Sequence, residues 1–224
     1  MRPISAIDAG PGTHPYLAAL RYGWLTPLYD PVIRWLFRED AMKSRLLDQI
    51  DPRPHERVLD IGCGTGTLAI LLKRTEPTAD VVGLDGDPAV LGIARRKTAA
   101  LGLEVRFDEG MAYDLPYEDA SFDAVVASLV LHHLAKRDKE DALREVYRVL
   151  RPAGSFHAMD FGVPQNGLMR SLARVSTWLE ETEDGVEGRF PLMFGAAGLD
   201  DVRVTSRSMT PLGTVALYRA KKLR

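Results

Sequence analysis

The stretch Val58-Leu59-Asp60-Ile61-Gly62-Cys63-Gly64-Thr65-Gly66 decides the fold of this 224-residue chain. Its apolar start predicts a buried strand over residues 57–61, and the pattern after it predicts a helix from Thr67 to Arg74, ended before Pro77. The glycines between strand and helix predict a tight turn, because glycine permits a positive φ and carries no Cβ. A ligand can lie directly against such a backbone. A strand–helix turn without any ligand is the alternative.

The glycine spacing and the acid before it indicate which ligand the turn suits. The dinucleotide fingerprint G-x-G-x-x-G would need a glycine at position 67, where Thr67 stands. Asp60 would repel a pyrophosphate, but it would attract the ammonium of an amino acid, directly or through water. The turn therefore favours a ligand with an aminoacyl group, and an NAD-linked oxidoreductase is kept as a competing hypothesis.

A second acidic position follows the next apolar run, which predicts a strand over residues 80–84. At its end, Asp85 would accept hydrogen bonds from both hydroxyls of a ribose lying along the glycine turn, each worth roughly 1.5–3 kcal/mol. An acid in a surface turn is the alternative for Asp85. Asp87 is expected to cap the next helix, with Pro88 at its first position, and that helix is predicted to end near Leu101.

Strand-like and helical patterns continue to alternate along the chain. Further strands are predicted at residues 104–107, 122–127 and 155–159. A helix is predicted from about Asp138 to Leu150, ended by a turn at Arg151-Pro152-Ala153-Gly154. This order predicts an α/β fold with a Rossmann-like, doubly wound, mostly parallel sheet whose strand carboxyl ends bind the ligand. An antiparallel hairpin, 202–206 and 214–218 with a turn at 211–213, is expected to complete the sheet.

We expect one domain with two additions. Residues 1–50 are interpreted as an N-terminal helical lid segment, residues 51–224 as the ligand-binding domain, and residues from about 161 to 192 as a cap insertion. The insertion carries an apolar stripe at helical spacing, Leu168, Met169, Leu172, Val175, Trp178 and Leu179. The stripe is either plain core packing or the wall of an acceptor pocket, and in the second case the acceptor is partly apolar.

Composition excludes several classes of function. The formal charge of −2 argues against a general nucleic-acid binder, and the basic end at residues 220–224 is expected to be solvated. Cys63 is the only cysteine, which excludes an intramolecular disulfide and a cysteine-rich metal site, and no metal is expected. We find no signal-peptide pattern and no apolar stretch long enough for a membrane span, so a cytoplasmic protein is expected. The oligomeric state does not follow from the sequence.

Four segments together resemble the successive motifs of class I S-adenosylmethionine (SAM)-dependent methyltransferases, at residues 58–66, 82–88, 115–127 and 148–154. The resemblance covers about residues 20–220 and is strongest for the broad group that includes ubiquinone and menaquinone methyltransferases, the methyltransferase domain 11 type. It implies a seven-stranded sheet with an antiparallel last strand and SAM as the cofactor, with S-adenosylhomocysteine as its product. It also implies a small-molecule methyl acceptor, which the sequence does not identify.

The resemblance also assigns cofactor contacts. It implies that Gly62, Cys63 and Gly64 line the methionine part of SAM, and Asp60 and Gly66 of the same stretch are candidate cofactor residues with them. The ribose and adenine side is expected at Asp85 and Gly86, and the border of the sulfonium at Ser128 and Leu129. Met111 stands where the family usually has an acid that accepts a hydrogen bond from the adenine amino group. That loss costs on the order of 1–3 kcal/mol, for which backbone groups of Ala112 would compensate.

Methyl transfer from a sulfonium requires few catalytic groups, because the methyl group already has a neutral thioether as its leaving group. Alignment of the acceptor and exclusion of water are the main requirements, and a base is needed only if the acceptor loses a proton. His132 and His133 are candidates for that base or for substrate contacts; the alternative is that both shape the pocket wall or cap the next segment.

In similar enzymes the N-terminal segment folds over the SAM site. We therefore take Tyr29 as a candidate catalytic residue and Tyr22 as a candidate cofactor contact, with aromatic packing as the alternative. Asp160 is expected either to touch the substrate or to cap the next segment. The predicted function is methyl transfer from SAM to a small acceptor. A SAM-binding protein without methyltransferase activity is the alternative, for which Met111 is the only support.

Overall fold

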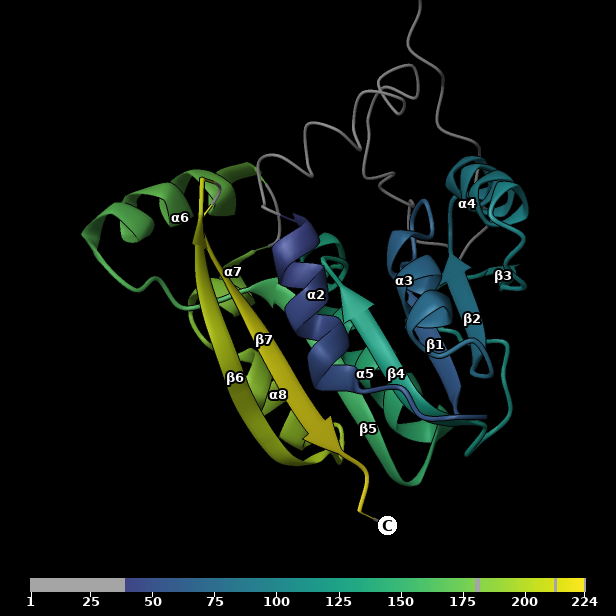
Figure 1. Cartoon of the computed structure of the whole chain (residues 1–224). Helices are drawn as coiled ribbons and strands as arrows, with labels where there is room; N and C mark the ends of the chain where they lie inside the picture. Colours follow the sequence, from purple (N-terminus) through teal and green to yellow (C-terminus); the bar gives the residue numbers. More distant parts are fainter. Residues whose placement is uncertain (1–38, 180–181, 212, 224) are drawn as a thin grey trace, which may run out of the picture.

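The computed structural model describes residues 39–179, 182–211 and 213–223 of the chain (Figure 1). Within these residues the strands form one seven-stranded sheet in the order β3-β2-β1-β4-β5-β7-β6. The strands are β1 (Arg57–Ile61), β2 (Asp80–Asp85), β3 (Arg106–Glu109), β4 (Phe122–Ser128), β5 (Leu150–Phe161), β6 (Asp200–Thr210) and β7 (Gly213–Lys221). Strands β1 to β5 pair in parallel, and β7 runs antiparallel to both β5 and β6. The predicted Rossmann-like sheet with an antiparallel C-terminal hairpin is confirmed.

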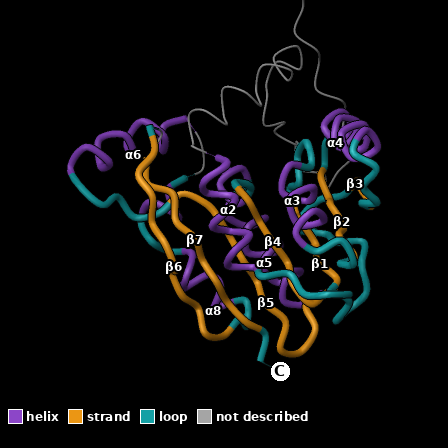
Figure 2. The backbone as a smooth tube through the Cα atoms, in the orientation of Figure 1, coloured by secondary structure: helices purple, strands orange, loops and turns teal. Residues whose placement is uncertain are grey.

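Helices cover both faces of the sheet (Figure 2). They are α2 (Glu39–Ile50), α3 (Thr67–Thr75), α4 (Pro88–Ala100), α5 (Lys136–Val149), α6 (Gly167–Leu179), α7 (Glu183–Val186) and α8 (Phe190–Ala196), with a short 3₁₀ helix η2 (Leu131–His133). Apolar side chains of α2, α3 and α4 share one buried cluster with alternate residues of the strands. Side chains of α5 and α8 share a second cluster with the other strand residues. Strand alternation therefore decides which face each side chain enters.

Residues 1–38 lie outside the described part, so only α2 of the predicted lid segment is seen. Its Met42, Leu46 and Ile50 are buried, as their helical spacing predicts. Gln49 Nε2 donates a hydrogen bond to the carbonyl oxygen of Tyr218 at 3.0 Å, which ties α2 to β7. The start of the following strand, β1, is where the sequence places it.

Several predicted boundaries of strands were wrong, because the true boundaries depend on contacts between strands that are distant in the sequence. Residues 151–154, predicted as a turn, belong to β5, whose register against β4 jumps from Phe122–Leu150 to Ala124–Ser155. Such a bulge is held by tertiary partners, since Arg151 Nη1 lies 2.7 Å from Asp123 Oδ2. The end of the chain is likewise not merely solvated: Lys222 Nζ donates to the carbonyl oxygens of Tyr147 and Leu150 at 2.8 Å.

The strands of the hairpin and β3 also differ from their predicted limits. Both hairpin strands are longer than predicted, since pairing extends from Asp200–Lys221 to Thr210–Gly213. Strand β3 lies two residues later than predicted, because its parallel register with β2 continues to the pair Asp85–Glu109. These polar residues carry no strand signal of their own and are strand only through their neighbour.

Candidate functional site

The glycine turn between β1 and α3 adopts the conformation that its sequence requires. Gly62, Gly64 and Gly66 have φ values of 63°, 52° and 75°. A Cβ on Gly62 would lie 2.3 Å from Cγ2 of Val130, whereas a Cβ on Gly64 would meet no described atom within 4 Å. Gly66 is the N-cap of α3, and no described side chain caps this helix end. The turn thus presents open space at Gly64 and backbone N–H groups at the start of α3.

Asp60 lies directly behind this turn, in an environment that does not suit a carboxylate. Asp60 is 1% exposed, and neither of its carboxylate oxygens has a hydrogen-bond partner among the residues that the structure describes. Burial raises its pKa to about 7, although the nearby ammonium of Lys43 acts in the opposite direction. The backbone N–H of Ala69 also acts to lower the pKa. A buried acid without a partner is costly, and a cationic ligand group would supply the partner.

Asp85, at the end of β2, holds the turn from the neighbouring strand. Its Oδ2 accepts a hydrogen bond from the N–H of Gly64 at 2.8 Å, and its Oδ1 accepts one from the N–H of Asp87 at 3.0 Å. Burial raises the pKa of Asp85, and these backbone donors oppose the rise. Each carboxylate oxygen can accept a further hydrogen bond from a ligand. Asp87 caps α4 as predicted, because its Oδ1 accepts from the N–H of Ala89 at 2.8 Å.

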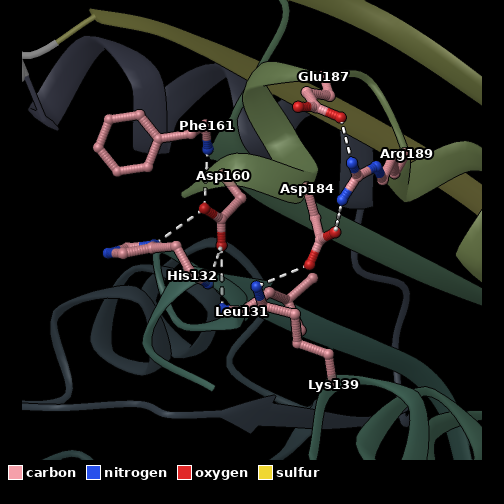
Figure 3. Close-up of polar contacts among 8 residues, drawn as sticks. All are labelled: Leu131, His132, Lys139, Asp160, Phe161, Asp184, Glu187 and Arg189. Carbon is pink, nitrogen blue, oxygen red and sulfur yellow. Dashed lines mark hydrogen bonds and ion pairs between the residues drawn. The ribbon is translucent and has the colours of Figure 1, made fainter. Parts of the chain in front are cut away.

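His132 and Asp160 form a buried pair at the carboxyl ends of β4 and β5 (Figure 3). Nδ1 of His132 lies 2.9 Å from Oδ1 of Asp160, and the Asp160 residue is 0% exposed. The other oxygen of Asp160 accepts hydrogen bonds from the N–H groups of Leu131 at 2.9 Å and His132 at 3.3 Å. Asp160 therefore bonds to the segment before it in the chain, η2, whereas the sequence predicted either a substrate contact or a cap for the segment after it.

A second group of charged side chains lies beside this pair (Figure 3). Lys139 of α5 and Asp184 of α7 are both buried, with Nζ 2.9 Å from Oδ2, and Arg189 Nη1 lies 3.1 Å from Oδ1 of Asp184. Arg189 also pairs with Glu187 (Figure 3). The Lys139–Asp184 ion pair holds α7, which is part of the predicted cap insertion, against α5, the helix that follows η2.

Comparison with known proteins supports one family. Residues 58–154 match the family described as a methyltransferase domain. A demethylmenaquinone methyltransferase of Thermus thermophilus is 42% identical over 153 residues, which are 67% of this chain and 69% of that protein. The chain belongs to the class I SAM-dependent methyltransferases. A protein of the same name from Deinococcus radiodurans is 43% identical over 119 residues, 53% of this chain and 48% of its own length.

Solved structures share the fold of this methyltransferase. A SAM-dependent methyltransferase from Methanosarcina mazei superposes with a TM-score of 0.66 at 20% identity, covering 80% of this chain and 97% of that one. The SAM dependence of the family can be tested on this chain's own geometry. Within the part of the chain that the structure describes, the carboxylate of Asp60 has no hydrogen-bond partner, the space at Gly64 is open and no side chain caps the start of α3; these features fit an aminoacyl nucleoside. The residues present therefore fit SAM, and the enzyme is a SAM-dependent methyltransferase.

The remaining predicted cofactor residues of the methyltransferase lie at the same sheet edge. Cys63 is buried and donates its N–H to the carbonyl oxygen of Leu84 at 3.0 Å, and burial raises the pKa of its thiol. Ser128 ends β4, and Leu129 follows it with a φ of 57°, a strained value for a leucine. After β3, the N–H of Gly110 donates to the carbonyl oxygen of Asp85 at 3.1 Å, which brings the Met111 segment beside the end of β2, where the sequence predicted the ribose contacts.

The rest of the predicted set is only partly described. Gly86 follows β2, and Ala112 is buried in the cluster on the α5 face. Tyr22 and Tyr29 lie outside the described residues. In the predicted stripe, Met169 is buried and Leu168 is 67% exposed, while the side chains of residues 174–181 are not described. No group of three or more possible metal-ligating side chains is found in the described ranges. Among the helices of these ranges, none has the length and apolar character that a membrane span needs.

Sequence reasoning missed two residues that shape the glycine turn of the methyltransferase. Val130 fills the space that a Cβ on Gly62 would need. Lys97 of α4 donates from Nζ to the hydroxyls of Thr65 and Thr67, at 3.2 and 3.1 Å. Both residues lie at least 30 positions away along the chain, and neither residue type signals such a contact. The position of Lys97 in the last turn of a helix is a common place for a basic residue and carries no functional signal.

Proposed function

We propose that this enzyme transfers the methyl group of SAM to a ring carbon of a reduced quinone related to demethylmenaquinone. The observation that carries the cofactor part is the buried carboxylate of Asp60, which has no hydrogen-bond partner among the described residues and lies behind a glycine turn. The α-ammonium of SAM would supply the missing partner. The support for the acceptor is the name shared by the two relatives that are 42% and 43% identical to this chain.

In this proposal the glycine turn and the acids beside it bind the cofactor. Asp60 attracts the ammonium, Gly62, Cys63, Gly64 and Gly66 border the methionine part, and the first N–H groups of α3 face its carboxylate. Asp85 and Gly86 bind the ribose, Met111 and Ala112 flank the adenine, and Ser128 and Leu129 border the sulfonium. Tyr22 and Tyr29 remain predicted contacts from the N-terminal segment. No metal takes part.

The redox state of the acceptor follows from the chemistry of the donor. SAM supplies an electrophilic methyl group, so the atom that receives it must be a nucleophile. A quinone ring is electron-poor, whereas the corresponding hydroquinone carries two electron-donating hydroxyls. An acceptor of this kind is a small, largely apolar molecule. The enzyme is therefore expected to methylate the hydroquinone and to leave the quinone unchanged.

Two experiments test the two halves of the proposal separately. S-adenosylhomocysteine at about 100 times its dissociation constant should stabilise the enzyme by about 2.7 kcal/mol, which corresponds to a rise in Tm of roughly 5–10 °C for a chain of this size. The absence of any calorimetric heat with SAM or S-adenosylhomocysteine would contradict the cofactor assignment. Labelled SAM is then incubated with a short-chain demethylmenaquinone, either oxidised or reduced with dithionite. Cofactor binding without any methylated product from the reduced form would favour a SAM-binding protein of another activity.

A further inference from the structure

Arg148 and Glu145 of α5 hold the segment that follows β3, residues 110–117, which we call the post-β3 segment. Nη1 of Arg148 donates a hydrogen bond to the carbonyl oxygen of Tyr117 at 2.6 Å, and Nη2 donates one to that of Leu115 at 3.0 Å. Oε2 of Glu145 accepts a hydrogen bond from the N–H of Leu115 at 2.8 Å. Two neighbouring side chains on one face of a helix therefore bond to several backbone groups of the post-β3 segment.

The two side chains also fix each other. Nε of Arg148 lies 2.7 Å from Oε1 of Glu145, and Nη2 lies 2.7 Å from Oε2, which makes a bidentate ion pair. The pKa of Glu145 lies below its ordinary value, chiefly because Arg148 donates hydrogen bonds to the carboxylate, so the pair is ionised at neutral pH. Nη1 of Arg148 also donates to Asp119 at 2.8 Å. The planar guanidinium sets the direction of each of these bonds, which the single ammonium of a lysine would not reproduce.

The other end of the post-β3 segment is fixed to the sheet. The N–H of Gly110 donates to the carbonyl oxygen of Asp85, at the end of β2, at 3.1 Å. Between this bond and the contacts with α5, Ala112 and Leu115 are buried in the cluster on the α5 face. The backbone of Met111 and Ala112 is thus held from two sides, by β2 and by α5.

The position of this backbone matters because of the residue type at position 111. In the proposed function Met111 and Ala112 flank the adenine of SAM, and a thioether is only a weak acceptor for the amino group of adenine. Recognition of the base then depends on backbone groups. The N–H of Ala112 donates to no acceptor among the residues that the structure describes, and the ring nitrogen N1 of adenine is an acceptor. A backbone group cannot adjust by rotating a side chain, so its position depends on what holds the segment.

We propose that Arg148 and Glu145 are positioning residues for the recognition of the adenine base of SAM. In this proposal neither side chain contacts the cofactor, and both act by placing the backbone of Met111 and Ala112. Loss of the Arg148 bonds should therefore weaken the binding of an adenine nucleoside and lower the preference for adenine over other purines, without changing the rate of the methyl-transfer step. The inference rests on the proposed function for the position of the adenine, whereas the contacts that carry it belong to the free enzyme.

Calorimetry with two nucleosides tests this role. S-inosylhomocysteine carries a hydrogen at N1 and an oxygen in place of the amino group, so it presents a donor where adenine presents an acceptor. The wild-type enzyme should bind S-adenosylhomocysteine at least about tenfold more tightly than S-inosylhomocysteine, which is the effect of one mismatched hydrogen bond. In Arg148→Lys this ratio should fall by about threefold or more, and KM for SAM should rise while kcat stays within about twofold.

Arg151→Lys is the matched control. Nη1 of Arg151 lies 2.7 Å from both carboxylate oxygens of Asp123, and this pair joins the start of β4 to the start of β5, at the strand ends opposite to the ligand edge. The control should also lose free energy of unfolding in urea, but its preference for S-adenosylhomocysteine should equal that of the wild type. A loss of stability alone therefore does not produce the result expected for Arg148→Lys.

Hydrogen exchange in the free enzyme tests the geometry without any cofactor. NMR should show slow exchange at the N–H of Leu115, and Glu145→Ala should accelerate that exchange by about tenfold or more, because the variant removes the acceptor. The N–H of Arg57, which donates to Oδ2 of Asp123 at 2.8 Å, should keep its wild-type exchange rate and serves as the internal control. Fast exchange at Leu115 in the wild-type enzyme would overturn the proposal, whatever the cofactor.

The binding results decide the rest. An unchanged nucleoside preference in Arg148→Lys, or an equal loss of affinity for both nucleosides, would overturn the positioning role. A wild-type enzyme that binds the two nucleosides equally would overturn it too, because the segment would then not recognise the base. If Arg148→Lys fails to fold, Glu145→Gln replaces it, since this variant keeps an acceptor for Leu115 but loses the ion pair, and it should also lower the preference. If the wild-type enzyme binds neither nucleoside, the proposed function fails and this inference with it, and slow exchange at Leu115 then reports structure alone.

Discussion

Replacement of Asp60 by asparagine is expected to stabilise the free enzyme and to weaken its affinity for the cofactor. In the folded chain the pKa of Asp60 rises from an ordinary value of 3.8 to about 7, mainly because the group is buried. Each pKa unit corresponds to about 1.4 kcal/mol, so an ionised Asp60 destabilises the fold by about 4 kcal/mol above pH 7. Because the folded pKa is the higher one, stability from this group is complete below about pH 4 and is lost as the pH rises toward 7.

Asparagine cannot ionise, and it resembles the protonated acid in size and polarity. The variant should therefore exceed the wild type in free energy of unfolding by about 4 kcal/mol at pH 8 and by only about 1.6 kcal/mol at pH 5. Urea unfolding monitored by tryptophan fluorescence at both pH values measures the difference, and effects of other groups cancel in it. Lys43→Met should act in the opposite direction and lower the free energy of unfolding above pH 7. The ammonium of Lys43 lowers the pKa of Asp60, so its loss makes the ionised carboxylate more destabilising.

The same reasoning links cofactor binding to protons. At pH 6 most of the free enzyme carries a protonated Asp60, and an ammonium placed beside it would favour the anion, so binding should release close to one proton. Calorimetry in buffers of different ionisation enthalpy measures that number, which should fall toward zero in Asp60→Asn. A stability difference between variant and wild type that is equal at pH 5 and pH 8 would refute the argument.

Three further changes test other parts of the molecule. Gly62→Ala should destabilise the fold by about 2–4 kcal/mol in urea, since a Cβ would meet Val130 at 2.3 Å and the φ is positive; a smaller loss in the Gly62→Ala, Val130→Ala double variant would trace the cost to this contact. Asp85→Ala should strongly reduce the rise in Tm caused by S-adenosylhomocysteine, and an unchanged rise would refute the ribose assignment. Lys139→Met should lower stability by several kcal/mol, measured in urea, because among the described side chains Asp184 would then keep the partly exposed Arg189 alone; recovery on adding Asp184→Asn would identify the buried charge as the cause.

The fold was predictable from sequence where the signals are local. The glycine turn, the strand before it and the Asp87–Pro88 start of α4 each depend on residues within a few positions of one another, and the structure agrees with them. The bulge in β5 was not predictable, because residues 151–154 have a turn composition and become strand only through pairing with β4 and the chain end. Backbone conformation there is decided by partners far away in the sequence.

For the candidate site, too, the positions of residues could be predicted from the sequence, but the contacts between them could not. Residue type and position identified Asp60, Asp85 and His132 as residues at the ligand edge, because parallel strands bring their carboxyl ends together. The sequence did not show that Asp85 already bonds to Gly64, or that Asp160 holds His132. Those contacts join residues 21 and 28 positions apart, and their geometry depends on sheet register and on the path of η2.

Asp60 and Asp160, the two buried acids at the sheet edge, differ in whether the described residues supply hydrogen-bond donors to their carboxylates. Strand alternation places Asp60 on the face covered by α2 and α3, and Asp160 on the face covered by α5 and α8. Asp160 accepts hydrogen bonds from backbone N–H groups and lies 2.9 Å from Nδ1 of His132, so its charge is already compensated. Asp60 has no such donors among the described residues, and the nearby ammonium of Lys43 offsets only part of the cost of burying its charge. The sheet edge thus holds one carboxylate that is already compensated, at Asp160, and one at Asp60 that lacks a hydrogen-bond donor among the described residues and suits a cationic ligand group.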